Sequence, residues 1–185
     1  MRMRDRFEHV LLNPSWEQIV ERDPLIAFSH YLCGRVHLLL AVADEIVENL
    51  DAGFSGESID GGHVERAESL MWLWTLGAYE VVRTMCQAKV CFTPRAFDEL
   101  NQLKKFLAAV RMPAAKMEKP RTSTPVNSNR SPAGWDVARR DLLIGDPESK
   151  DVFARTLLAE FDRVFSSIKG NDVVARHEDA YPPEA

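Results

Sequence analysis

Four side chains that can ligate transition metals fall on one side of a helix predicted over residues 25–50. At about 100° per residue, His30, Cys33, His37 and Asp44 project within roughly 60° of one another. Imidazole, thiolate and carboxylate groups are ligands of zinc and related ions, so these four residues are the candidate metal ligands. The alternative is a solvated polar helix face, and we expect no cofactor.

A second group of polar side chains interrupts an apolar helix predicted over residues 63–89. Trp72, Tyr79, Glu80 and Arg83 combine aromatic faces with charges of both signs. Such a group in a cleft can bind a ligand by stacking and by ion pairing. Glu80 and Arg83 are also three residues apart on one helix face, so a structural ion pair within the helix is the alternative.

The middle of the chain is basic, although the protein has a net charge of −5. A basic segment can contact nucleic-acid phosphates or an acidic protein surface, and the alternative is solvated loop charge. The candidate residues for such a contact are Lys104, Lys105, Arg111, Lys116, Lys119, Arg121 and Arg130.

Amphipathic helices must position these groups. Over residues 25–50, apolar residues recur at steps of three and four, with Pro24 in the first turn and Asp23 as a helix cap. The next long helix is apolar on nearly all sides, which is typical of a central helix. The same periodicity and capping signals predict further helices over residues 15–21, 63–89, 94–111 and 149–169.

Between the third and fourth long helices the composition changes. Residues 112–134 contain four prolines among polar and basic residues, which predicts a long loop. Residues 135–144 are either loop or strand. The pattern predicts an all-α antiparallel bundle of four long helices, with a short N-terminal helix and a long Pro-rich basic loop. We expect one domain over residues 1–169 and a flexible acidic tail over residues 170–185.

The composition favours a globular intracellular protein. Hydrophobic residues make up 45% of the chain and charged residues 28%, which excludes a largely disordered chain. The sequence has neither the apolar core of a signal peptide nor an apolar run long enough to cross a bilayer, so we expect no membrane contact. Cys33, Cys86 and Cys91 do not form a CxxC pair, and we expect reduced thiols and a cytoplasmic location.

The order of the predicted helices resembles that of the HEPN superfamily of helical bundles. The resemblance covers residues 25–168 and includes the segment Trp72-Leu-Trp-Thr-Leu-Gly-Ala-Tyr-Glu80 in the second long helix. It implies a bundle in which active members are RNases, with an arginine and a histidine four to six residues apart near a helix end.

That catalytic spacing is poorly placed in this chain. It occurs only between Arg4 and His9, ahead of the predicted bundle, while Arg35 and His37 are two positions apart. We therefore expect a non-catalytic binding or interaction module, either a homodimer through a helix face or a partner of another protein. The alternatives are a HEPN-like RNase or nucleic-acid-binding protein, and a metal-binding bundle.

Overall fold

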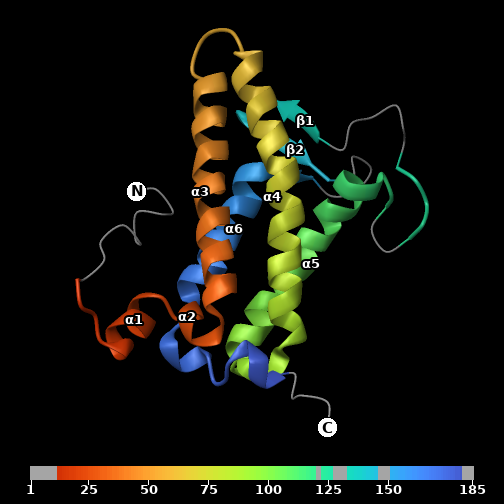
Figure 1. Cartoon of the computed structure of the whole chain (residues 1–185). Coiled ribbons are helices and arrows are strands. Elements are labelled where there is room, and N and C mark those ends of the chain that lie inside the picture. The colour runs from red at the N-terminus through yellow and green to blue at the C-terminus, as the bar shows by residue number, and fades with distance from the viewer. Residues whose placement is uncertain (1–11, 120–121, 127–132, 146–150, 181–185) are drawn as a thin grey trace.

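Helices dominate the computed structural model, which describes residues 12–119, 122–126, 133–145 and 151–180. A small three-stranded antiparallel sheet lies beside the helices (Figure 1). The expected long packed helices are present, but the all-α prediction is wrong because of this sheet. None of the described helices is long and apolar enough to cross a lipid bilayer.

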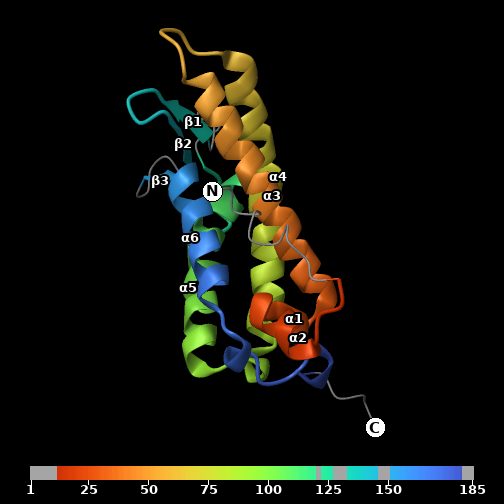
Figure 2. The same cartoon turned by 90° about the vertical axis from the view of Figure 1, so that its left-hand side faces the viewer.

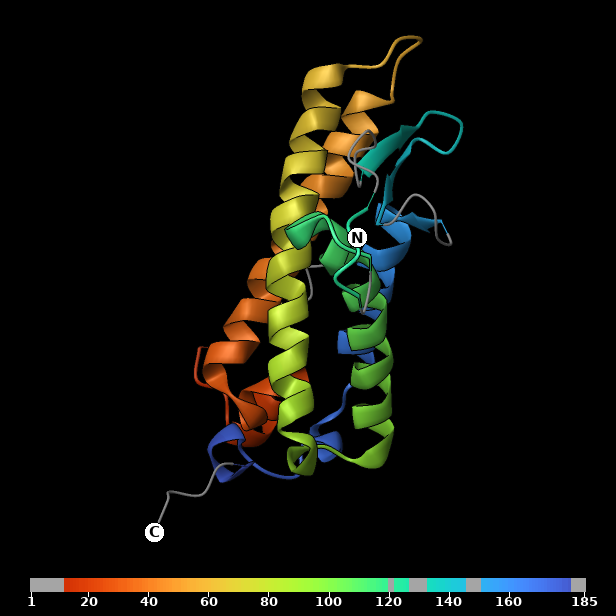
Figure 3. The same ribbon diagram turned by 90° about the vertical axis from the view of Figure 1, so that its right-hand side faces the viewer.

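The three longest helices pack side by side. They are α3 (His30–Gly53), α4 (Gly61–Gln87) and α5 (Pro94–Lys116), and α4 lies between the other two (Figures 1 and 3). α6 (Ala154–Ser167) packs against α5 and α3 from the other side (Figure 2). Each of these helices buries a continuous apolar face in one common core, which explains why the sequence periodicity predicted them.

The first predicted long helix is interrupted near its start. A separate turn, α2 (Leu25–Phe28), follows α1 (Trp16–Arg22), and Ser29 then breaks the helix because its backbone is extended. The Ser29 hydroxyl accepts a hydrogen bond of 3.3 Å from the backbone N–H of Leu32 and so caps α3. The break turns the α1–α2 segment back against the first turns of α3.

α5 is longer than its sequence predicts. It begins as expected at Pro94, with Thr93 as its cap, but it continues through Pro113 as far as Lys116. Met117 then ends the helix in a left-handed conformation, with φ of 56°. The extra turn extends the helix toward the sheet.

Three short strands form the sheet, in the order β1 (Ala133–Asp136), β2 (Asp141–Ile144) and β3 (Val152–Phe153). β1 and β2 form a hairpin in which Asp136 pairs with Asp141 and Ala133 pairs with Ile144. The ambiguous segment over residues 135–144 therefore contains a turn and most of two strands. The last helix begins at Ala154, later than predicted, because β3 precedes it.

The core centres on Trp74 of α4, whose side chain is almost completely buried. Its indole packs edge-on against Phe161 of α6 at 5.1 Å between ring centroids, and its Nε1–H donates to the Leu39 carbonyl at 2.9 Å. Trp72 and Leu73 on the same helix are about half exposed, so α4 is not buried on all sides. This open side of α4 faces the sheet.

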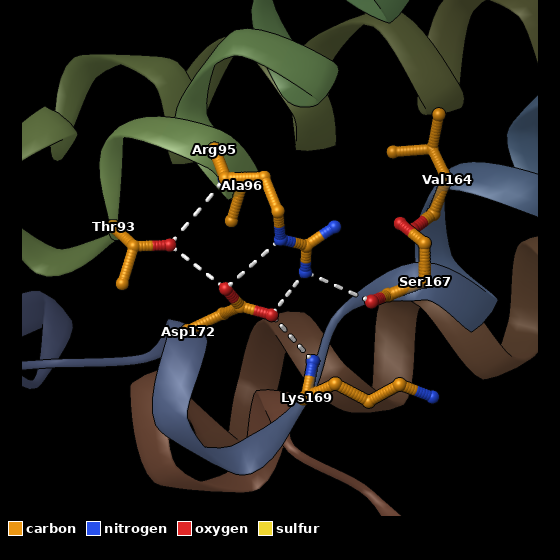
Figure 4. Close-up of polar contacts among 7 residues, drawn as sticks. All are labelled: Thr93, Arg95, Ala96, Val164, Ser167, Lys169 and Asp172. Atoms are coloured by element: carbon orange, nitrogen blue, oxygen red, sulfur yellow. Dashed lines mark hydrogen bonds and ion pairs between the residues drawn. The ribbon is translucent and has the colours of Figure 1, made fainter.

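Residues 170–180 lie against the bundle, although a flexible tail was predicted from residue 170. The buried Asp172 carboxylate accepts hydrogen bonds from the Thr93 hydroxyl at 2.8 Å and the Lys169 backbone N–H at 2.9 Å, and it pairs with Arg95 (Figure 4). Arg95 also donates to the Ser167 carbonyl at 3.0 Å. These contacts hold the segment around Asp172 against the start of α5.

Candidate functional site

The four candidate metal ligands on α3 do not converge on one point. His30 is exposed at the first position of α3, and Asp44 is buried two turns beyond His37. Cys33 and His37, one helical turn apart, do meet, with 3.7 Å between the Cys33 Sγ and the His37 Nε2. Their further partner is Asp23, whose position before Pro24 predicted only a helix cap.

Asp23 lies in the turn between α1 and α2, and its carboxylate reaches both side chains. Its Oδ2 is 2.5 Å from the His37 Nε2 and accepts a hydrogen bond of 3.0 Å from the Cys33 Sγ. Burial raises the pKa of the Asp23 carboxyl, but the hydrogen bonds from His37 and Cys33 outweigh burial and leave this pKa below its ordinary value. Of the described residues, only these three form such a cluster of potential metal ligands.

The predicted cleft residues on α4 separate into two places. Glu80 pairs with Arg83 at 2.8 Å and with Arg111 of α5 at 3.6 Å, and the Arg111 guanidinium lies 4.9 Å from the centroid of the Tyr79 ring. The Glu80–Arg83 contact is the ion pair within the helix that was the structural alternative, and Arg111 also links this pair to α5. Trp72 lies elsewhere and lines a cavity.

This cavity, which we call the α4–sheet cavity, has a volume of about 670 Å³. It lies between α4, the last turns of α5 and the hairpin of β1 and β2. Its apolar lining comes mainly from Met71, Trp72, Leu73, Val110, Leu142 and Ile144. A volume of this size accommodates a ligand of the size of a typical cofactor or drug.

Acidic groups lie along the α4 side of the same cavity. Glu65 and Glu68 are three residues apart and share a helix face with Trp72. Glu68 accepts a hydrogen bond of 3.3 Å from the Nε1–H of Trp135 on β1. Among the described residues that line the cavity, none is basic. The arrangement offers an apolar surface with a negative edge.

Two features of the fold create this cavity. The helix extension past Pro113 brings the Ala114 carbonyl to the Nε1–H of Trp72, at 2.9 Å, and so fixes that indole. The β1–β2 hairpin supplies the opposite wall, with Leu142 and Ile144 buried. Sequence reasoning found Trp72 but missed Glu65 and Glu68, because their spacing looks like that of an ordinary solvated helix face.

The described part of the basic segment is dispersed. Lys104 and Arg111 lie about two turns apart on one face of α5, whereas Lys105 and Lys116 lie about three turns apart on a second face, roughly 100° to 120° away. Lys119 follows the helix. The other two predicted contact residues, Arg121 and Arg130, lie outside the described residues.

The residues considered for RNase chemistry make separate contacts where they are described. Arg35 donates to the Tyr31 hydroxyl at 2.8 Å, while His37 faces Asp23. Arg4 and His9 lie outside the described residues. No family model, curated protein or solved structure matches the chain. The resemblance to the HEPN superfamily and the homodimer both stay predictions.

Proposed function

We propose that the protein is a binding module that takes an amphiphilic cation in the α4–sheet cavity. The observation that carries this proposal is an apolar cavity with two carboxylates at one edge. Apolar contact with Met71 and Leu142 would bind the body of the ligand, and Glu65 and Glu68 would attract its positive charge.

The aromatic side chains support the same ligand class. Trp72 is 49% exposed and Trp135 is 40% exposed, although both indoles are held by hydrogen bonds. Fixed, half-exposed indoles favour stacking and cation–π contact, because their faces are available and little side-chain entropy is lost on binding. A ligand with a primary amine or guanidinium on an aromatic or aliphatic body would contact the carboxylates, the indoles and the apolar lining at the same time.

A matched pair of compounds tests the proposal. 1-Naphthylmethylamine carries a positive charge at neutral pH, and 1-naphthylmethanol is its neutral analogue of nearly equal shape. We expect isothermal titration calorimetry to show binding of both compounds, with the amine tighter by about 5- to 30-fold, because the two exposed charge pairs contribute roughly 0.5 to 1 kcal/mol each.

Two variants test whether the preference for the amine over the alcohol arises in the cavity. In the Glu65→Gln/Glu68→Gln protein most of the preference for the amine should be lost, and only the part that comes from cation–π contact with the indoles should remain. The control is Asp98→Asn/Glu178→Gln, which removes the same charge from exposed sites distant from the cavity and should keep the preference for the amine. If neither compound binds at millimolar concentration, or if the preference for the amine is undiminished in the cavity variant, the proposal is wrong.

A further inference from the structure

A second site, independent of the α4–sheet cavity, lies at the opposite end of the bundle. Cys33 and His37 occupy successive turns of α3, and Asp23 approaches them from the α1–α2 turn. Asp23 and Cys33 are buried and His37 is partly exposed. Three groups with different donor atoms, thiol, imidazole and carboxylate, therefore converge from two parts of the chain.

The contact pattern argues against a nucleophilic cysteine. In a cysteine–histidine–carboxylate relay, the thiol and the carboxylate contact opposite ring nitrogens of the histidine. Here the Asp23 Oδ2 and the Cys33 Sγ both face the Nε2 of His37, at 2.5 Å and 3.7 Å. Burial and the neighbouring Asp23 carboxylate also raise the pKa of the Cys33 thiol, which disfavours the thiolate of a free nucleophile.

Convergence of all three donor atoms on one point is instead the geometry of metal ligation. We propose that Asp23, Cys33 and His37 bind a zinc ion. Around a tetrahedral zinc ion with bonds of roughly 2.0 to 2.3 Å, donor atoms lie about 3.3 to 3.6 Å apart. The observed separation of 3.7 Å between the Cys33 Sγ and the His37 Nε2 already matches this spacing.

The carboxylate needs only a small movement to complete the set. The Asp23 Oδ2 lies 2.5 Å from the His37 Nε2 and 3.0 Å from the Cys33 Sγ, so it must withdraw by less than about 1 Å to admit the ion. Zinc binding displaces the thiol proton to solvent, because the metal ligand is the thiolate. The proton that the His37 Nε2 shares with Asp23 must also leave, to solvent or to the Nδ1 of the same ring, because zinc binds the unprotonated nitrogen. The positive ion then takes the place of both protons between the three donor atoms.

A small cavity beside this cluster leaves room for a fourth ligand. A cavity of about 120 Å³ adjoins Asp23 and His37 and is also lined by Glu21, Ser166 and Lys169. This volume holds a water molecule, which occupies about 30 Å³ in the liquid. Zinc sites with three protein ligands and a bound water are typical of ions that remain accessible to small molecules.

Cobalt provides a direct probe of the coordination. We expect the metal-free protein, titrated with Co²⁺ under reducing conditions, to bind one equivalent. It should show a thiolate-to-cobalt charge-transfer band in the near ultraviolet and intense visible bands of tetrahedral Co²⁺. Equimolar Zn²⁺ should abolish these bands. Cys33→Ser should remove the charge-transfer band, and His37→Gln should weaken Zn²⁺ binding by more than about 100-fold, since even second-shell losses cost 10- to 100-fold.

Two matched variants serve as controls. Cys86→Ser changes another buried thiol, and His30→Gln changes an exposed histidine on the same helix. Both should bind Co²⁺ and Zn²⁺ as the unmodified protein does. His37 is partly exposed, so His37→Gln tests the site even if Cys33→Ser fails to fold. The proposal is overturned if the protein takes up no stoichiometric metal, or if uptake is lost in His30→Gln and retained in His37→Gln.

Discussion

Replacing Trp74 with alanine tests the packing of the bundle. The indole is 1% exposed, packs against Phe161 and donates to the Leu39 carbonyl. Truncation of a buried aromatic side chain to alanine costs about 3 to 5 kcal/mol of unfolding free energy, through lost burial and the cavity that remains. The lost hydrogen bond contributes about 1 kcal/mol and the lost ring pair about 1 kcal/mol within that total. We therefore expect a loss of about 4 kcal/mol.

Trp72, two residues earlier on the same helix, is the matched control. It is 49% exposed and has one hydrogen bond, to the Ala114 carbonyl, so Trp72→Ala should cost roughly 1 to 2 kcal/mol. Urea unfolding followed by far-ultraviolet circular dichroism measures both losses, and similar m-values would validate the comparison. Equal losses for Trp72→Ala and Trp74→Ala would refute the assignment of Trp74 to the core.

Two further predictions concern charged residues. Burial raises the pKa of Asp172, but the hydrogen bonds from Arg95, the Lys169 backbone and Thr93 outweigh burial and lower it. Its stabilising contribution should therefore be complete above about pH 4, near the unfolded pKa, and should be lost as the pH falls through the lower folded value. Urea unfolding should show Asp172→Asn to be less stable than the unmodified protein by about 1 to 2 kcal/mol at pH 7, with a smaller difference at pH 3. Separately, Lys116→Gln/Lys119→Gln should leave any RNA affinity unchanged in fluorescence anisotropy at physiological salt, because the described basic residues of α5 do not share one face. A large loss of affinity would contradict this expectation and support the nucleic-acid hypothesis.

The long helices could be predicted because their evidence is local. In α3, α4 and α5 the core residues recur at helical spacing, and Thr93 with Pro94 marks the start of α5. Local signals predicted the wrong helix boundaries at the positions where tertiary contacts determine whether the helix continues. The apolar pattern passes through Ser29, yet its side chain caps a new helix. Pro113 was expected to end α5, but it is buried and the helix continues for one more turn.

The candidate sites depended on contacts that the sequence does not encode locally. Cys33 and His37 were predicted together because they are four residues apart on one helix. Asp23 joined them only through the fold of the α1–α2 turn. Glu68 and Trp135, which meet at the α4–sheet cavity, are 67 residues apart in the chain. The position of the β1–β2 hairpin had to be known before that cavity could be recognised.

The tryptophan indoles report directly on the proposed binding of a cationic ligand in the α4–sheet cavity. In a ¹H–¹⁵N correlation spectrum, titration with 1-naphthylmethylamine should shift the indole N–H signals of Trp72 and Trp135, because Trp72 lines this cavity and the Trp135 indole donates to Glu68 at its edge. The signal of Trp16, which is half exposed on α1 at the other end of the bundle, should not move (Figure 1). Shifts at Trp16 alone, or no shift at Trp72 and Trp135 under saturating ligand, would show that the cation does not bind in this cavity.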